Sequence, residues 1–166
     1  MSMSFIKNRF DLLFAKLTSM FSKACQYGIR SVIYICSESA KGNKVGAKEI
    51  SQKTGVPEPF IAKILQDLAR KKIIGSTKGP TGGFFVDNTH QSLTLKQLVE
   101  AIDGENLFTG CSLGLDNCSE ENPCPVHNEI KKIRVGIVKM LTQKSIEVFA
   151  KEVENGDTVL TRLILS

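Results

Sequence analysis

Apolar residues at helical spacing mark the first interpretable segment of the chain. Between Ser22 and Ala40 they recur at intervals of three, four and seven, at Cys25, Ile29, Val32, Ile33, Cys36 and Ala40. This spacing predicts one buried face of an α-helix, with Ser22 as its N-cap. Because Cys25 and Cys36 lie on that face, we expect both thiols to be inert core residues.

A helix-turn-helix pattern follows this first helix. We expect a short helix over 47–53, closed by Gly55, and a further helix that begins at Pro57 and runs to about Lys72. The inward positions of the latter are Ile61, Ile64, Leu65 and Leu68.

The next segment, 73–86, predicts two short strands around the tip Lys-Gly-Pro-Thr-Gly-Gly. The tip glycines allow the backbone to approach a sugar-phosphate chain closely, and Lys78 supplies charge beside them. A nucleotide-binding P-loop is disfavoured because the Walker lysine pattern is absent. A helix-turn-helix followed by a hairpin is a winged helix, so we expect a mainly α fold with a small β wing.

The C-terminal half is helical. Thr94 and Gln97 form a capping-box pattern for a helix to about Ile102, and Ser145 can cap another to Val153. Between them, a long helix from Pro125 has a regular apolar stripe: Val126, Ile130, Ile133, Ile137, Met140 and Leu141. Pairing with a twin helix in a homodimer would bury this stripe, and docking back on its own domain is the alternative.

These patterns predict an N-terminal extension (1–21), a winged helix-turn-helix domain (22–104), a cysteine loop (105–124), a dimerisation helix region (125–154) and a tail (155–166). The extension is basic and mildly amphipathic, so it either lies on a surface or is a leader before Met20. No run is long enough to span a bilayer, and five cysteines, an odd number, argue against a secreted disulfide framework. We therefore expect a cytoplasmic protein without a membrane partner.

Charge is unevenly distributed. Residues 41–78 contain nine bases and three acids, whereas residues 97–130 contain seven acids and no lysine or arginine. The basic block suits a polyanion such as DNA, because each phosphate contact releases counterions. The acidic block suits a cationic partner or a thiolate site.

That acidic block contains three cysteines and a histidine, Cys111, Cys118, Cys124 and His127. Cys124 occupies the expected N-cap of the long helix, where the helix dipole favours a thiolate. Three thiolates suit an iron–sulfur cluster or zinc, although the tight Cys-x₂₋₄-Cys knuckles common in zinc sites are absent. His127 is either the fourth ligand or a residue that only lines the helix start.

Together, "SKACQYGIRSVIYI", "AKEISQKTGVPEPFIAKILQDLARKKIIGSTKGPTGGFFV", "SLTLKQLVEAIDG" and the cysteine trio resemble the Rrf-two family of bacterial transcription regulators over about residues 22–153. The resemblance implies a dimeric winged helix that binds palindromic promoter DNA and is tuned by a cluster bound through the three cysteines. This sequence has Lys78 where arginine is commoner, and its first cysteine gap is one residue longer than usual.

On this resemblance we expect the recognition helix to enter the major groove, and the wing to hold the adjacent backbone or minor groove. The residues expected nearest DNA are Glu58, Phe60, Lys63 and Gln66 on the helix and Ser76, Lys78, Gly79, Pro80 and Thr81 on the wing.

The expected function is that of a transcriptional regulator, most often a repressor in this family, and not of an enzyme. Its promoter affinity would be tuned by a 2Fe-2S or 4Fe-4S cluster that senses iron, redox or nitric oxide status. The alternatives are a zinc- or thiol-based regulator on the same scaffold, or a cluster-carrying electron-transfer protein.

Overall fold

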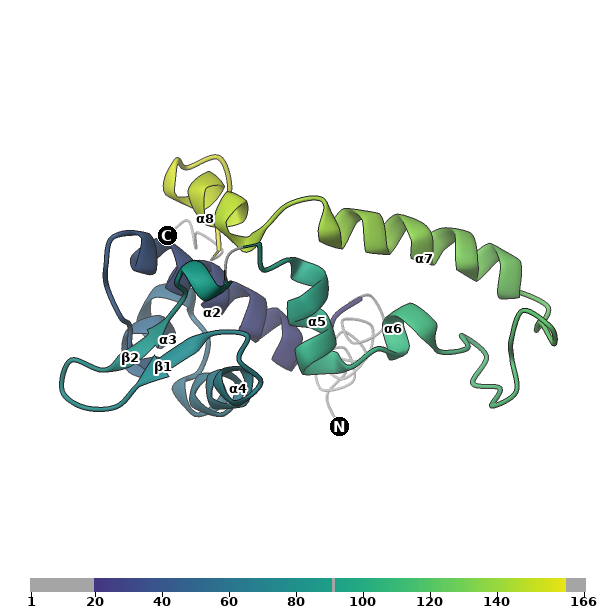
Figure 1. Cartoon of the computed structure of the whole chain (residues 1–166), viewed down its shortest axis with the longest axis horizontal. Helices are drawn as coiled ribbons and strands as arrows, with labels where there is room; N and C mark the ends of the chain where they lie inside the picture. Colours follow the sequence, from purple (N-terminus) through teal and green to yellow (C-terminus); the bar gives the residue numbers. More distant parts are fainter. Residues whose placement is uncertain (1–19, 91, 161–166) are drawn as a thin grey trace, which may run out of the picture.

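The computed structural model describes residues 20–90 and 92–160, and Figure 1 shows its arrangement. The helices and strands are α2 (Lys23–Ala40), α3 (Ala47–Thr54), α4 (Glu58–Arg70), β1 (Gly75–Thr77), β2 (Gly83–Phe85), the short 3₁₀ helix η1 (Asn88–His90), α5 (Leu95–Asp103), α6 (Asn106–Thr109), α7 (His127–Thr142) and α8 (Ile146–Glu154). The mainly helical fold with a small antiparallel wing is the predicted one. No helix within the described residues is long and apolar enough to cross a membrane.

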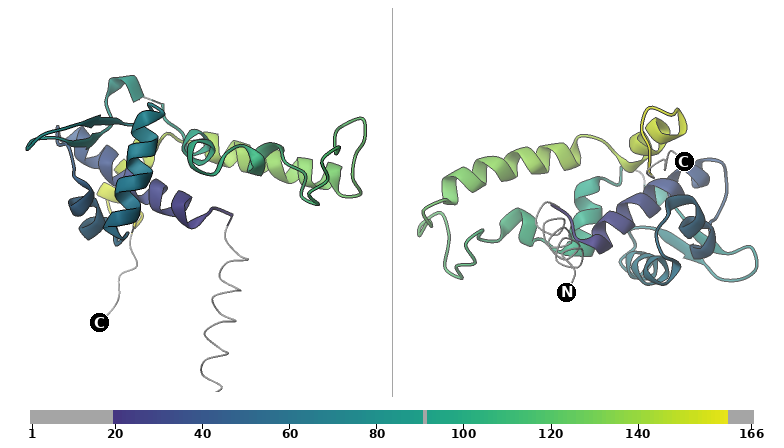
Figure 2. Two further views of the ribbon diagram at one scale, coloured as in Figure 1. Left: turned by 90° about the horizontal axis from the view of Figure 1, so that it is seen from below. Right: turned by 180° about the vertical axis from the view of Figure 1, so that it is seen from behind.

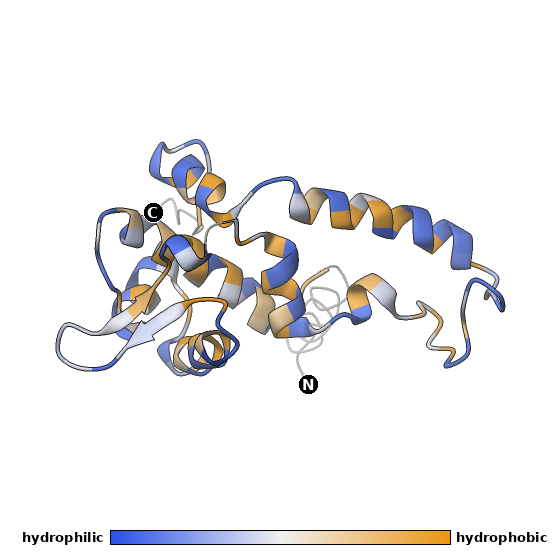
Figure 3. Ribbon diagram, in the orientation of Figure 1, coloured by the Kyte–Doolittle hydropathy of each residue, from blue (hydrophilic) through white to orange (hydrophobic). Residues whose placement is uncertain are grey.

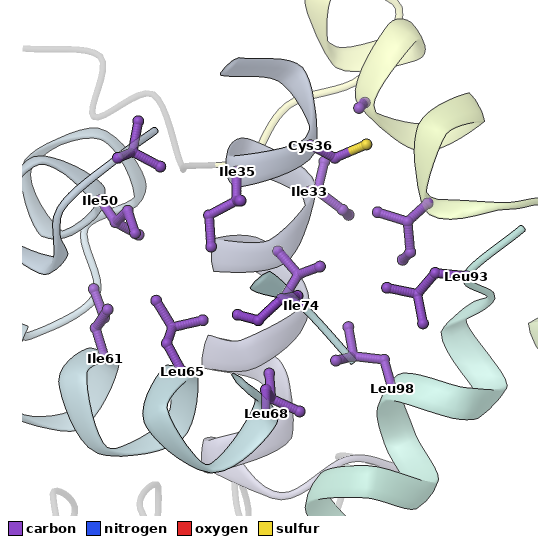
Figure 4. Close-up of a cluster of buried hydrophobic side chains, with 14 of the residues drawn as sticks. Ile33, Ile35, Cys36, Ile50, Ile61, Leu65, Leu68, Ile74, Leu93 and Leu98 are labelled. Carbon is purple, nitrogen blue, oxygen red and sulfur yellow. The ribbon is translucent and has the colours of Figure 1, made fainter. Parts of the chain in front are cut away.

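The central element is α2, against which α4, α5 and α8 pack. Its start is fixed as expected, because the Ser22 hydroxyl accepts a hydrogen bond from the Cys25 amide at 3.0 Å. Cys25 and Cys36 are buried, which confirms their assignment to the core. Figure 4 shows the core between these helices, a cluster of buried side chains that includes Ile35, Leu65 and Leu98. Each such side chain contributes about 1.5–3 kcal/mol by leaving water.

The helix-turn-helix consists of α3 and α4. Gly55 ends α3 in the left-handed region at φ +66°, as the sequence predicts. Helix α4 ends at Arg70, two residues earlier than expected, because Lys72 adopts φ +58° and the chain leaves the helical path there.

The wing is an antiparallel pair in which Gly75, Ser76 and Thr77 lie opposite Phe85, Phe84 and Gly83. Val45, from the turn between α2 and α3, joins the sheet through a bridge to Phe84, with N–O distances of 2.9 and 3.1 Å. A Cβ on Gly83 would come within 2.8 Å of the Val45 backbone, so this close approach requires glycine. The wing is thereby attached to the α2–α3 turn.

The capping box of α5 is present. Thr94 accepts from the Gln97 amide, while the Gln97 side chain accepts from the Thr94 amide. The expected N-cap role of Cys124 is wrong, however, because α7 begins at His127 with Val126 at the cap position. The Cys124 carbonyl instead accepts a hydrogen bond from the His127 amide at 3.0 Å, in a turn that precedes the helix.

We call residues 20–104 together with α8 the head, and residues 105–142 the arm. Figures 1 and 2 show the arm extending away from the head, with the cysteine loop at its far end. From Glu105 to Met140, a segment described without a gap, no side chain is buried. Along α7, where Figure 3 shows alternating apolar and polar segments, Ile133 is 58% exposed and Val135 65%, whereas Leu141 is buried against the head.

The chain returns to the head at the start of α5, whereas it left from the other end of that helix, after Gly104. Thr94 and Ser145 form an antiparallel bridge, and the Ile146 amide donates to the Leu93 carbonyl at 2.7 Å. Helix α8 then restarts at Ile146, so a break separates it from α7. Docking of α7 onto its own domain is therefore limited to its C-terminal end. The two possibilities for the N-terminal extension concern mainly residues 1–19, which lie outside the described residues.

Candidate DNA-binding face and metal centre

The residues expected nearest DNA are all exposed. On α4 these are Glu58, Phe60, Lys63 and Gln66, and on the wing Ser76, Lys78, Gly79, Pro80 and Thr81. Phe60 is 59% exposed and its ring lies 6.1 Å from that of Tyr27 on α2, so an apolar contact holds it at the surface. In Figures 1 and 2 the wing tip lies at the end of the molecule opposite the cysteine loop.

Ion pairs divide the basic block into engaged and available cations. Lys41 pairs with Glu38 at 3.0 Å and with Glu154 at 3.3 Å. Arg70 pairs with Asp67, and Lys71 donates to the Ala101 carbonyl at the end of α5. By contrast, no carboxylate of the described residues lies within ion-pair distance of the following cations: Lys44, Lys48, Lys53, Lys63, Lys72 and Lys78. The available charge therefore lies on the α2–α3 turn, α3, α4 with the residue Lys72 that follows it, and the wing.

The structure brings the three loop cysteines together. The sulfur atoms of Cys111, Cys118 and Cys124 all lie within 4.8 Å of one another, and each residue is half-buried. The Cys111 and Cys124 sulfurs are 3.9 Å apart. His127 lies beside this group and contacts one of its members, because its Nδ1 is 3.2 Å from the Cys118 sulfur.

The thiols differ in acidity. Backbone amides of Leu115 and Leu113 hydrogen-bond to Cys111 and lower the pKa of its thiol to about 7. At Cys118 the Cys124 amide favours the thiolate, but desolvation and the neighbouring thiols outweigh this contact and raise its pKa. Burial raises the pKa of the core thiols instead, to about 12 for Cys25 and about 11 for Cys36. The surroundings of Cys111 thus favour its thiolate, whereas those of Cys118 favour its protonated thiol.

Residues on α7 support the site. Glu120 accepts from Lys131 Nζ at 2.6 Å and lies 3.3 Å from His127 Nε2, so it orients the imidazole. Arg134 donates to the Gly110 carbonyl and fixes the entry to the loop. The sequence patterns described above do not predict a role for Glu120, Lys131 or Arg134. The signal was available, because Lys131 and Arg134 follow His127 by four and seven positions and therefore share its helix face.

The donor set fits a thiophilic metal or an iron–sulfur cluster. Three thiols and one imidazole converge, and no lysine or arginine lies between Gln97 and Ile130 to compete for the thiolates. Two thiolates on one tetrahedral ion, each about 2.3 Å from it, would be about 3.8 Å apart. The 3.9 Å between Cys111 and Cys124 is close to that spacing.

A winged helix-turn-helix with available cations, joined to a three-thiol site, defines a winged-helix transcription regulator. The family model described as Rrf2, iron-dependent transcriptional regulator, matches residues 21–152. The chain belongs to this family, the Rrf-two family that the sequence resembles.

Individual relatives are similarly described. The chain is 28% identical over 117 residues to a putative HTH-type transcriptional regulator of Aquifex aeolicus, which covers 69% of this chain and 80% of the relative. It is 22% identical over 134 residues to the HTH-type transcriptional regulator IscR of Sodalis glossinidius, covering 81% and 80%. These relatives are transcriptional regulators and not enzymes.

Solved structures share the fold. IscR of T. potens aligns with a TM-score of 0.65 at 14% identity, covering 87% of this chain and 95% of that one. CymR, the global cysteine regulator of B. subtilis, aligns with a TM-score of 0.61 at 18% identity, covering 79% and 95%. The winged-helix assignment rests on both sequence and architecture.

Proposed function

We propose that this Rrf2-family regulator binds palindromic promoter DNA as a homodimer in the bacterial cytoplasm and acts as a repressor. We further propose that an iron–sulfur cluster held by Cys111, Cys118, Cys124 and His127 tunes its DNA affinity. The observation that carries this proposal is the convergence of three half-buried thiols, one of which lies 3.2 Å from the imidazole of His127 at the start of α7.

DNA would be read by α4 and held by the wing. Glu58, Phe60, Lys63 and Gln66 present polar and aromatic groups to the base edges of the major groove. Ser76, Lys78 and Thr81, with the backbone at Gly79 and Pro80, contact the adjacent sugar-phosphate chain or minor groove. Support for these roles comes from the exposure of all nine residues and from the absence of carboxylate partners for Lys63 and Lys78 within the described chain.

A homodimer would form through α7. Ile133 and Met140 expose 58% and 47% of their surface, although they belong to an apolar stripe. Within the described residues of one chain only Leu141 of this stripe is buried, while Val126, Ile130 and Ile137 are half-buried. A twin helix would bury it and would place two heads on the two half-sites of a palindrome.

The site can influence DNA binding because His127 is the first residue of α7. A bound iron–sulfur cluster would be a chemical sensor, because oxidant, nitric oxide or iron shortage can cause its loss. When they bind a cluster, the three cysteines and His127 would hold the loop against the first turn of α7. Without it, that turn loses the constraint, and the angle between the two heads changes.

The test is anaerobic purification followed by iron, sulfide and visible-absorbance measurements, and then by binding to labelled promoter fragments. Cys118→Ala should abolish the visible absorbance and change operator affinity at least about tenfold, within the usual range of allosteric coupling. Ser112→Ala, in the same loop, is the matched control and should leave both unchanged. Unchanged affinity of Cys118→Ala at every promoter would contradict the proposed switch.

The sulfur spacing favours one second candidate, a zinc- or thiol-based regulator on the same scaffold. Its signature is one equivalent of zinc without sulfide in protein purified without oxygen. In metal-free protein, diamide would then oxidise Cys111 and Cys124 to a disulfide, with loss of two protons and two electrons from the thiols to the diamide. Peptide mapping distinguishes this pair, 3.9 Å apart, from pairs that involve Cys118.

A further inference from the structure

Lys44 lies in the turn between α2 and α3, and the wing holds it in place. The next residue, Val45, exchanges two backbone hydrogen bonds with Phe84 of β2. The Lys44 ammonium lies 3.3 Å from the Thr77 hydroxyl and 5.0 Å from the centre of the Phe85 ring. Backbone and side chain are therefore both attached to the wing, directly beside the residue that precedes Lys78.

The Lys44 ammonium retains hydrogen-bonding capacity. It has three N–H donors, and the described residues use one of them, on Thr77. Two acids, Glu38 and Glu49, line the same open groove of about 630 Å³, which Thr81 of the wing also borders. Both acids already have partners, because Glu38 accepts from Lys41 and Asn43, and Glu49 accepts from the Tyr34 hydroxyl at 2.9 Å.

Lys41, three residues earlier, is the natural comparison. Its ammonium pairs with Glu38 at 3.0 Å and with Glu154 of α8 at 3.3 Å, so its charge is compensated inside the protein. A phosphate could engage Lys41 only by replacing these carboxylates. The two lysines belong to one short segment, yet only Lys44 presents an uncompensated charge.

We propose that Lys44 contacts the DNA phosphate backbone beside the wing and that Lys41 does not. This inference rests on the proposed function and adds a positioning residue to it. Lys44, held beside Thr77 at the end of β1, and Lys78, at the wing tip, would engage the same sugar-phosphate chain through two ammonium groups. The contact fixes the register of the wing on DNA without reading the base sequence.

The experiment measures DNA affinity as a function of salt concentration, with an operator obtained by in vitro selection on the wild-type protein. Each phosphate neutralised contributes about 0.9 to the slope of log affinity against log salt. Lys44→Met keeps the apolar stem on Phe85 and removes one charge at each half-site of the homodimer, so the slope should fall by about 1.8. Lys44→Arg should restore the slope, and Lys41→Met should retain the wild-type slope.

The outcomes separate the two proposals. If wild-type protein shows no salt-dependent affinity for any duplex, the proposed function itself is overturned. If the wild-type protein binds and Lys44→Met keeps the full slope, or if Lys41→Met loses as much slope as Lys44→Met, only the role of Lys44 is overturned. A thermal unfolding curve for each variant checks that the heads are folded.

Discussion

The head and the arm use the same kinds of residue in opposite ways. Thiols Cys25 and Cys36 in the head are buried and have pKa values raised to about 12 and about 11, whereas Cys111 in the arm has a pKa lowered to about 7. Apolar side chains of the head form a buried core, but those of the arm are half-buried or exposed from Glu105 to Met140. The head therefore has a core of its own, while the arm depends on whatever its thiols and its apolar stripe bind.

The largest effect is expected in the core of the head. Leu65 on α4 is completely buried, so Leu65→Ala should lower the free energy of unfolding by about 2–5 kcal/mol. Leu113→Ala, in the arm at 53% exposure, should change it by less than about 0.5 kcal/mol. Urea denaturation at one protein concentration measures both. Equal losses would show that the arm contributes a core of its own.

The apolar stripe of α7 should dominate self-association. Ile133→Asp places a charge on a surface that a twin helix would desolvate, so the dimer should weaken about a hundredfold, which corresponds to about 2.7 kcal/mol. Lys132→Ala, at the neighbouring exposed position, should leave the dimer intact. Sedimentation equilibrium gives both constants. A monomeric wild-type protein at high concentration would contradict the role given to α7.

Removing the bound metal or cluster should loosen the arm alone. Amides of residues 111–126 should exchange with solvent at least about tenfold faster after chelation, since few other contacts hold this loop. Amides of α2 and α4 should keep their exchange rates because the core of the head is independent of the site. Hydrogen exchange followed by mass spectrometry resolves the two regions, and a uniform increase would mean that they unfold together.

The smallest effect concerns the support of His127. Glu120→Gln removes the charge that Lys131 and His127 share, and the pKa of the Glu120 carboxyl is lowered by its hydrogen bonds to these two side chains. Because the Glu120 side chain is 65% exposed, solvent screens the effect, and cobalt(II) should bind only about two- to fivefold more weakly. Glu121→Gln is the control, and the cobalt absorbance reports both.

Local sequence signals predicted the head well. The Thr94–Gln97 capping box, the Gly55 helix end and the wing turn depend on residues within a few positions of one another, and all three are present. The ion pair between Lys41 and Glu154 joins residues 113 positions apart, so no local pattern contains it. The start of α7 was misplaced because the turn from Cys124 to His127 competes with a helix for the same carbonyl.

The sequence predicts that the three loop thiols share one site, but it does not predict which two sulfur atoms lie closest to each other. Spacing along the chain does not distinguish Cys111 beside Cys124 from Cys111 beside Cys118, because glycines and prolines allow several paths for the loop. The contacts that select one path, from Arg134 to Gly110 and from Lys131 to Glu120, form only once α7 has folded beside the loop.

The bridge between Thr94 and Ser145 attaches the end of the arm to the start of α5, whereas the arm begins after Gly104, at the other end of that helix. The two attachments of the arm are therefore separated by the length of α5, a helix whose Leu98 and Val99 are buried in the head. A displacement of the arm would act on both ends of this one helix, and so on the face of α2 that packs against it.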